Sequence, residues 1–391
     1  MFCQAAQTSG YSATILEQWN FGQNGTHCGQ KTAGGNADGN GIGDFLNAPP
    51  SGFLAPCSAN LAVPTPKKST EHFDIATYAG NGATAQEISL NFNADLVWIK
   101  SRSDTEHHSL VDRVRGDVAV NSNQNIAEYA VANFDWNTNN TVDVPVYAND
   151  YSMNTSGDNY VMWHWKAGGS GSTNNDGAEA STVSVNTTAG FSILKGQGTG
   201  SSTTYGHGLG VVPKVYIVKL ISDTGDWYLQ TSALDGGWDY FQLNGTAAPA
   251  SMTATAPTSS VIYSNATDDE DFLIYAWAEV EGFSRFGNYI GNGNVDGVFV
   301  NCGFRPAYVL FKNHSSSAWW WVHDTGRDPS NLNTLILFPN ATTADYTSGS
   351  NGVDFLSNGI KLRADNDLNG SGQNVFFMAF AEFPFKYANA R

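Results

Sequence analysis

The sequence predicts an all-β protein built from three tandem β-sandwich repeats, of the jelly-roll or concanavalin-like kind, with about 100 residues in each. Two observations lead to this prediction. Charged residues make up only 14% of the 391 residues while glycine occurs 41 times, a composition typical of short strands joined by polar turns. Three kinds of segment also recur along the chain, and no long stretch has the apolar spacing of an amphipathic helix.

The clearest recurring segment is an aromatic and β-branched run that follows a polar turn. Its three copies are residues 156–167, 268–279 and 371–382, which place Trp165, Trp277 and Phe380 at matching positions. Each run has roughly eight residues and is too short and too aromatic for a helix. We therefore expect three buried strands.

A second segment recurs upstream of each run as an apolar strand that ends in lysine, at Lys100, Lys219 and Lys312. We expect each of these strands to pair beside, or to face, the aromatic strand of its own repeat. A third segment is the Tyr-x-Gly-Asn-Gly turn at 78–82, repeated at 289–293 and more weakly at 194–198. The lysines lie 119 and 93 positions apart (219 − 100 and 312 − 219), which suits a sandwich better than a solenoid, whose period is about 20–50 residues.

These repeats predict four parts of the chain. They are a short, irregular β segment with a linker at 1–70 and sandwich repeats at 71–180, 181–286 and 287–391. Within this scheme we expect the Gly- and Ser-rich residues 168–177 to form a flexible connection between the first two repeats.

Charge and composition exclude several classes of partner. The net charge is −17, from 36 acidic and 19 basic residues, so we expect no binding to nucleic acid and weak attraction to anionic membranes. No run of about 18 apolar residues is present, so no membrane insertion is expected. The chain has four cysteines, expected to be mostly free and buried, although a local disulfide among the first three is an open alternative: Cys3, Cys28, Cys57 and Cys302.

Two parts of the chain resemble known protein families. The N-terminal segment resembles the closing strands of SPRY-type concanavalin-like domains in marine phage fibre proteins, on the residues 18–23, 49–53 and 59–64. The remainder, roughly 72–391, is similar to a repeat module at the C-termini of marine bacteriophage virion proteins. That resemblance is carried by residues 95–102, 109–116, 205–210, 278–284 and 381–391.

The resemblance implies a structural and adhesive virion protein without enzymatic activity, such as a tail fibre or surface fibre. It would be assembled in the host cytoplasm, act outside the cell, contact other virion proteins and bind host surface polysaccharide. By analogy with fibres we expect a homotrimer. Two alternatives stay open, namely a capsid decoration protein and a secreted concanavalin-like lectin or glycoside hydrolase.

Carboxylates that could hydrolyse a glycan occur at Glu279 and Glu281, on one face of an expected strand. However, Ser284 stands where concanavalin-like hydrolases often have a third carboxylate, and Glu382 matches Glu279 in another repeat. A structural role is favoured, and no catalytic residue is assigned. A second pattern, Asp-x-x-Arg at 112–115 and 324–327, is expected to brace a loop through charge-assisted hydrogen bonds.

Two loops have the alternating oxygen ligands of a calcium site. The candidate ligands are Asn36, Asp38, Asn40 and Asp44 in the first loop and Asp365, Asp367 and Asn369 in the second. Phe376 occupies the position where a bidentate glutamate would complete the second loop. Such loops are also ordinary hairpin turns, so calcium is only a possible cofactor, and its site would be weak.

The strongest candidate for ligand contact is the run Trp319-Trp320-Trp321. Because side chains alternate along a strand, one or two of these rings should point away from the core. With Asn313, His314 and Asp324 nearby, they predict a shallow glycan-contact surface that combines ring stacking with polar groups. The alternative is that the rings fill a core between repeats or between subunits.

Overall fold

In the computed structural model, the chain is described at residues 3–6, 15–18, 21–22, 24–26, 29–61, 63–146, 152–264, 266, 268–347, 352–365 and 367–387. Two compact units divide it, Met1–Val63 and Pro64–Arg391. The prediction of an all-β fold with β-sandwich repeats is confirmed, since 41% of the residues are in strands. Helical structure in the described residues is confined to three 3-10 turns, η1 (Ser58–Asn60), η2 (Ser69–Glu71) and η3 (Phe385–Tyr387).

The first unit contains one antiparallel hairpin of β1 (Cys3–Ala6) and β2 (Ile15–Gln18). The rest of its described chain is turns and loops, closed by a bridge between Asn36 and Phe45.

The first repeat of the second unit is a sandwich of two antiparallel sheets. The larger sheet has the order β3 (Phe73–Ala79), β11 (Asn159–Trp165), β5 (Leu96–Ser101), β6 (Ser109–Asp112), β7 (Val118–Val120) and β8 (Tyr129–Ala130). The smaller has the order β4 (Gln86–Ser89), β10 (Thr141–Val144) and β9 (Asp135–Trp136).

The second repeat has an eight-stranded sheet and a two-stranded one. The former has the order β12 (Ser172–Asn174), β13 (Ser181–Asn186), β14 (Phe191–Gln197), β21 (Asp271–Trp277), β16 (Val215–Leu220), β17 (Trp227–Thr231), β18 (Asp239–Gln242) and β19 (Ala250–Ser251). The latter pairs β15 (Thr203–Gly206) with β20 (Val261–Ser264). The Gly- and Ser-rich segment 168–177 is therefore no simple connection, because it contains β12, which pairs with β13.

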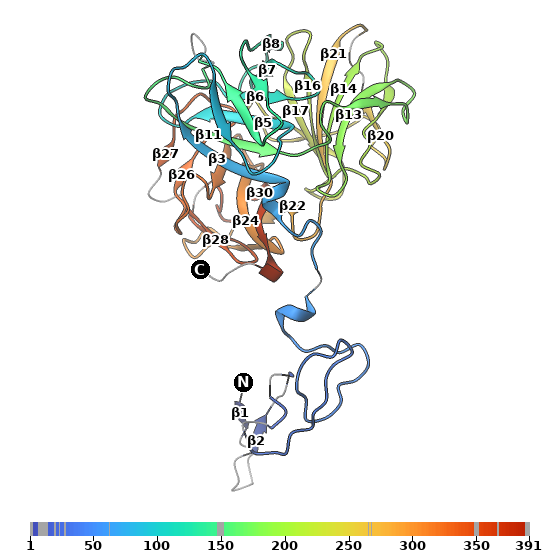
Figure 1. The fold of residues 1–391 in the computed structure, drawn as a ribbon, viewed down its shortest axis with the longest axis vertical. Helices are drawn as coiled ribbons and strands as arrows, with labels where there is room; N and C mark the ends of the chain where they lie inside the picture. The colour runs from blue at the N-terminus through green and yellow to red at the C-terminus, as the bar shows by residue number, and fades with distance from the viewer. Residues whose placement is uncertain are drawn as a thin grey trace. The chain divides into compact units, whose positions relative to one another are not determined.

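The third repeat has three sheets. The largest has the order β22 (Ser284–Ile290), β30 (Asn374–Pro384), β24 (Phe304–Asn313) and β25 (Trp320–Asp324). The second has the order β23 (Phe299–Asn301), β29 (Gly359–Arg363) and β28 (Gly352–Leu356), and the third pairs β26 (Leu335–Ile336) with β27 (Tyr346–Thr347). Figure 1 shows the strands of the first repeat in blue to green, those of the second in green to yellow, and those of the third in orange to red.

In each repeat the strand that ends in lysine pairs directly with the aromatic strand, as expected. β5 pairs with β11, β16 with β21, and β24 with β30, all antiparallel. This shared pairing gives a residue-by-residue correspondence among the three repeats, in which Lys100, Lys219 and Lys312 are equivalent.

Both faces of each larger sheet are buried, which explains why these strands are continuously apolar rather than alternating. On β5, Val97 and Ile99 point into the sandwich core of the first repeat, whereas Leu96 and Trp98 point the opposite way. Those opposite faces meet in one central core to which all three repeats contribute. The fold therefore has three separate sandwich cores and one that is shared.

At the centre of the shared core lie three rings at equivalent positions, Trp165, Trp277 and Phe380. Every pair is in contact, with ring centroids 6.2 Å apart for Trp165–Trp277, 5.6 Å for Trp165–Phe380 and 6.4 Å for Trp277–Phe380. Mutual contact of three equivalent groups indicates an approximate threefold axis within the single chain.

Equivalent hydrogen bonds link the repeats in a closed cycle. Trp227 Nε1 in the second repeat donates to the Asn121 carbonyl of the first, at 2.7 Å. Trp320 Nε1 in the third donates to the Gln242 carbonyl of the second, at 3.1 Å. His108 Nε2 in the first lies 3.0 Å from the Phe338 carbonyl of the third. Since donors and acceptors occupy matching positions, each repeat uses the same surface to hold its neighbour, and the ring closes.

The repeated lysines belong to the same interfaces. Each is fully buried, and burial lowers the pKa of each to about 8. Lys312 Nζ donates to the Thr246 carbonyl of the second repeat at 2.9 Å, and Lys100 Nζ donates to the Asp104 carbonyl within its own repeat at 3.0 Å. Backbone carbonyls thus satisfy the buried ammonium groups, and Lys312 Nζ also lies over the Trp320 ring, 5.5 Å from its centroid.

The two Asp-x-x-Arg pairs brace loops, as expected, but each also holds a neighbouring repeat. Asp112 and Arg115 form a buried 2.6 Å ion pair, and the Tyr275 hydroxyl of the second repeat donates to Asp112 at 2.8 Å. Asp324 and Arg327 form the equivalent 2.5 Å pair. Trp163 Nε1 of the first repeat donates to Asp324 at 3.1 Å.

The interface between the second and third repeats lacks both the Asp–Arg pair and the side chain that donates to it. Thr231 and Leu234 replace the ion pair, and Met378 stands at the position of Tyr275 and Trp163. An apolar side chain therefore occurs where the neighbouring repeat offers no carboxylate. The donor and its acceptor are present or absent together.

Replacing Trp277 with alanine should lower the free energy of unfolding by about 3–5 kcal/mol, because it removes one of the three mutually contacting rings and leaves a cavity. Chemical denaturation monitored by circular dichroism measures the change. An unfolding midpoint equal to that of the wild type would contradict the placement of this ring at the centre of the core.

Replacing Tyr275 with methionine alone should destabilise by about 1–3 kcal/mol, because Asp112 loses a buried hydrogen bond. The combination Asp112→Thr, Arg115→Leu and Tyr275→Met copies the interface between the second and third repeats and should be more stable than the sum of its parts implies. A favourable coupling of about 0.5–3 kcal/mol is expected from denaturation of the three-part cycle. Simple additivity would contradict the coupling of donor and ion pair.

Candidate functional site

Of the three consecutive tryptophans, only Trp319 reaches solvent. It directly precedes β25 and is 46% exposed, whereas Trp320 is completely buried in the shared core and Trp321 is buried in the core of the third repeat. Alternation along β25 sends Trp320 and Trp321 into different cores. Trp319 lies before the strand, on the same side as Trp321, and remains at the surface.

Trp319 belongs to a row of three rings, which we call the aromatic row: Trp319, Phe338 and Tyr346. The centroids of Trp319 and Phe338 are 5.5 Å apart, and those of Phe338 and Tyr346 are 5.9 Å apart. Tyr346, on β27, is also 46% exposed. Beneath the row, the buried Trp321 packs edge-on against Phe338, at 5.8 Å, so the middle ring has a rigid support.

The polar residues expected beside the tryptophans do not form a surface with them. Asn313 is buried, and its side chain donates to the Asp367 carbonyl at 2.8 Å. Asp324 is completely buried in its ion pair with Arg327. His314 is half-buried, with Nε2 2.9 Å from Asn288 Oδ1. The predicted glycan-contact surface was therefore wrong for Trp320, Trp321, Asn313 and Asp324, because internal contacts engage them.

The fold does not require the aromatic row, as the other two repeats show. The residues equivalent to Trp319 are His107 and Asp226, and those equivalent to Phe338 are Asn121 and Gln242. Both other repeats close the same interface without a Phe, Tyr or Trp at these positions. The row lies on the boundary of the third and first repeats, since the Phe338 carbonyl contacts His108.

The aromatic row can contact a flat apolar surface and carries no charge of its own. Ring faces of this kind stack on the apolar faces of sugars and on other rings. Sequence reasoning found Trp319 through the alternation of the tryptophan run. It missed Phe338 and Tyr346, because each is an isolated aromatic residue with no motif around it.

The first candidate calcium loop is held together by Asp38 rather than by a cation. Its carboxylate accepts N–H groups from Asn40, Ile42, Ala55 and Asn60, at 2.6–2.9 Å. Burial raises the pKa of Asp38, but these hydrogen bonds outweigh that effect and bring the pKa to about 2. Both oxygens are thus engaged by donors, which does not fit a metal ligand.

The remaining first-loop candidates also serve the loop. The amide of Asn36 donates to the Leu46 carbonyl at 3.1 Å, and that of Asn40 donates to Asn60 Oδ1 at 3.0 Å. Asp44 accepts the Gly25 N–H at 3.0 Å. A hydrogen-bonded turn therefore accounts for the alternating Asn and Asp residues, and the calcium interpretation of this loop does not fit the geometry.

The second candidate calcium loop is explained by a repeated structural asparagine. Asn369 is fully buried, and its amide donates to Asn292 Oδ1, the Asn294 carbonyl and the Ala364 carbonyl, at 2.7–2.8 Å. Asn154 holds the matching turn of the first repeat through Asn81 and Ala83.

Asp365 and Asp367 are exposed beside that asparagine. Because Asn369 presents its N–H₂ group to the carbonyls, it does not fit a calcium ligand. Among the described residues, no group of three or more His, Cys, Asp or Glu side chains is placed to hold a metal ion.

The carboxylates considered for glycan hydrolysis have structural partners. Glu279 Oε1 accepts the Phe286 N–H at 2.8 Å and lies 3.6 Å from Arg285. Its counterpart Glu382 forms a 2.5 Å ion pair with Arg305. Both therefore brace strand ends in their repeats, and Glu281 is exposed next to the first of them.

Two of the four cysteines can be described. Cys57 is exposed and Cys302 is buried, and both are free thiols, while Cys28 and the side chain of Cys3 lie outside the described residues. Within the described residues, no helix has the length and apolar character needed to cross a membrane.

Replacing Asp38 with alanine should lower the midpoint of thermal unfolding of the first unit, because four N–H groups lose their acceptor. Since the folded-state pKa is about 2, below the ordinary aspartate pKa of 3.8, this stabilisation is present above pH 3.8 and is lost as the pH falls through about 2. Scanning calorimetry over this pH range tests both points. A rise in the midpoint on adding millimolar calcium would contradict the account, which predicts no change.

Comparison with known proteins identifies a family but no characterised relative. Residues 68–384 match the family described as a domain of unknown function, DUF7483. Neither a curated protein nor a solved structure matches the chain. The matched residues take in all three repeats of the ring and nearly all of the second unit. The chain therefore belongs to the DUF7483 family.

Proposed function

We propose that this protein is a non-catalytic adhesion module of a bacteriophage virion, a tail fibre or surface fibre component that contacts host surface glycans through the aromatic row. The observation that carries the proposal is Trp319, a large apolar ring left 46% exposed at a position where the other two repeats have the polar residues His107 and Asp226. Trp319 is not isolated, because Phe338 adjoins it and Tyr346 adjoins Phe338, and contiguous exposed apolar groups mark contact sites more often than single exposed rings do.

The chemistry of the row supports a glycan as its ligand. Trp319 and Tyr346 present rings to solvent beside the half-buried Phe338, and the pyranose ring of a sugar has apolar faces that stack on such groups. A strongly acidic chain also disfavours nucleic acid, the other common partner of exposed rings. The structural roles of Glu279 and Glu382 support adhesion without hydrolysis.

The virion assignment is supported by the resemblance of residues 72–391 to repeat modules of phage virion proteins. Oligomerisation as a homotrimer remains part of the proposal by analogy with fibres. The closed ring gives no added support to a homotrimer, because the three repeats of one chain already form a closed threefold arrangement without further subunits. A stacked ring is worth about 0.5–1.5 kcal/mol, so useful binding would require several copies on one particle.

Replacing Trp319 with alanine should abolish binding of the oligomer or intact particle to a polysaccharide array while leaving the unfolding midpoint close to that of the wild type. The matched control is Phe299→Ala, which removes a 45% exposed ring from β23 of the same repeat, outside the row. The control should bind normally. Normal binding by the Trp319 variant would leave only a scaffold role for this chain.

A further inference from the structure

The first repeat contains an open cleft between the edges of its two sheets. It has a volume of about 460 Å³ and is lined by residues 74–78 of β3, residues 86–91 on and after β4, and His164 of β11. Because β3 and β4 are both edge strands, the cleft opens to solvent between them. Its size falls within the range of about 300–1,000 Å³ that is usual for small-molecule sites.

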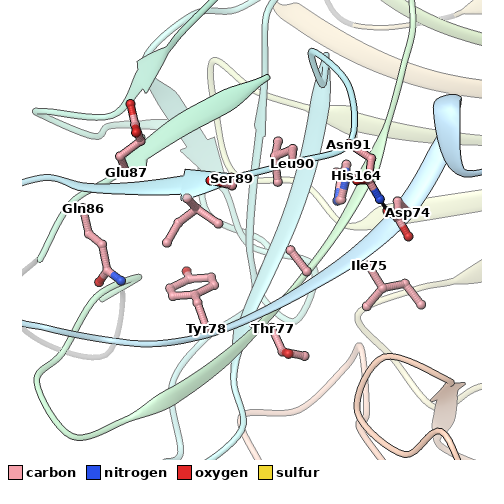
Figure 2. A pocket seen from close by; sticks show the side chains of 12 residues that line it. Asp74, Ile75, Thr77, Tyr78, Gln86, Glu87, Ser89, Leu90, Asn91 and His164 are labelled. Atoms are coloured by element: carbon pink, nitrogen blue, oxygen red, sulfur yellow. Dashed lines mark hydrogen bonds between the residues drawn. The ribbon is translucent and has the colours of Figure 1, made fainter. Parts of the chain in front are cut away.

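Side chains at one end of the cleft are polar and close together, as Figure 2 shows for Asp74, Asn91 and His164. Asp74 and His164 are directly opposite each other on paired strands, so both face the interior of the sandwich. The Asn91 amide donates to the Asp74 carboxylate. Farther along, the walls include the apolar side chains of Ala76, Tyr78, Ile88 and Leu90, which pack on the sandwich core.

The Nε2 atom of His164 has no hydrogen-bond partner among the described residues, although the side chain is 99% buried (1% exposed). One face of its ring packs on Phe92, at 4.9 Å, and Nδ1 has only a distant contact with the Met162 carbonyl, at 3.5 Å. Burial lowers the pKa of His164 to about 4, so the ring is neutral near pH 7. A buried polar atom without a partner is unfavourable unless a ligand or an ordered water satisfies it.

The other two repeats show that the fold does not need this histidine. The equivalent residues are Ala276 and Ala379. Opposite them, where the first repeat has Asp74, lie Ser192 and Arg285. Ser192 is itself satisfied, because its hydroxyl donates to the His207 carbonyl at 2.6 Å. In the third repeat, His323 Nε2 also lacks a partner, but His323 does not line the cleft of that repeat at residues 279–285 and 301–303. Among the described residues, the first repeat places such a histidine against an open cleft.

We propose that this cleft is a binding site for a neutral saccharide, with His164 and the Asp74–Asn91 pair contacting ring hydroxyls. A hydroxyl both donates and accepts, so it can satisfy His164 in either tautomer, whereas an ammonium group can satisfy only one. The carboxylates of Asp74 and Glu87 disfavour acidic sugars and phosphates. The apolar wall formed by Ala76, Ile88 and Leu90 suits the carbon face of a sugar ring.

The position of His164 also argues against an extended peptide added to the free edge of β3. Such a strand would lie beside β3 in the plane of the sheet, whereas His164 faces inward between the two sheets. The ligand must therefore insert between the layers. This site is independent of the aromatic row and uses a different repeat, so either can fail without the other.

Saturation-transfer NMR with glucose, galactose, mannose and N-acetylglucosamine, and with glucuronic acid and a lysine-bearing peptide as contrasts, tests the proposal on the full chain. At least one neutral sugar should bind, and His164→Ala should weaken it at least tenfold. That variant copies the alanine of the other repeats, so its unfolding midpoint should equal or exceed that of the wild type. Trp319→Ala should bind the same sugar normally.

Three results would overturn the proposal. They are the absence of binding by any neutral sugar, undiminished binding by the His164 variant, and binding confined to the peptide or the acidic sugar. Loss of sugar binding in the Trp319 variant but not in the His164 variant would assign the sugar to the aromatic row instead. Histidine side-chain ¹⁵N shifts give a second readout, since Nε2 of His164 should shift on saturation with the sugar and the other histidines should not.

Discussion

Contact among Trp165, Trp277 and Phe380 is the interaction on which the rest of the second unit depends. In each sandwich the larger sheet is apolar on both faces, but its smaller sheet can cover only one of them. The other apolar face needs a further partner. Three repeats placed about an approximate threefold axis bury those extra faces against one another. The interior of the ring is therefore as much a hydrophobic core as the inside of each sandwich, and no repeat buries all of its apolar surface by itself.

Closure of the ring also explains the buried polar groups. Indole and imidazole nitrogens reach backbone carbonyls of the neighbouring repeat, and two interfaces add an Asp–Arg pair that accepts a further donor. Buried ion pairs contribute little net stability when they could be replaced by apolar groups of similar volume. The interface between the second and third repeats has that replacement, with Met378 at the position of the donor and Thr231 and Leu234 at the positions of the ion pair. The two ion pairs therefore add directional contacts between repeats without a large net gain in stability.

Internal repetition separates scaffold from function within one chain. A residue needed by the fold should have similar counterparts in the other repeats, as the lysines and the central rings do. Trp319 and His164 break that pattern in opposite ways. Trp319 is an apolar ring turned to solvent, and His164 is a polar ring turned inward without a partner. In both cases the counterparts show that a simpler residue serves the fold.

Much of the fold could be predicted from the sequence because the same strand pattern occurs three times along the chain. The paired strands ending at Lys100, Lys219 and Lys312 followed from repetition and apolar pattern alone. The ring could not be predicted, because a strand buried on both faces has the same apolar pattern whether it packs on a sheet or on another repeat. That ambiguity is also why Trp320 and Trp321 were assigned to a surface.

The candidate sites were harder to foresee than the fold. Asp38 and Asn369 have the spacing of calcium ligands, and only the direction of their hydrogen bonds shows that the loops use them differently. The cleft beside His164 has no sequence signal, since its residues come from three separate strands. The cleft is evident only once β3 is paired with β11 and β4 is placed opposite them.

Native-state hydrogen exchange is the most direct test of the central claim that the three repeats share one core. With increasing denaturant, amides of β11, β21 and β30 should exchange through the same global unfolding event, with equal free energies of opening, because none of these strands can be exposed without opening the shared core. If the strands of one repeat exchanged through a separate event of much lower free energy, the three sandwiches would be independent domains, and the account of the ring would be wrong.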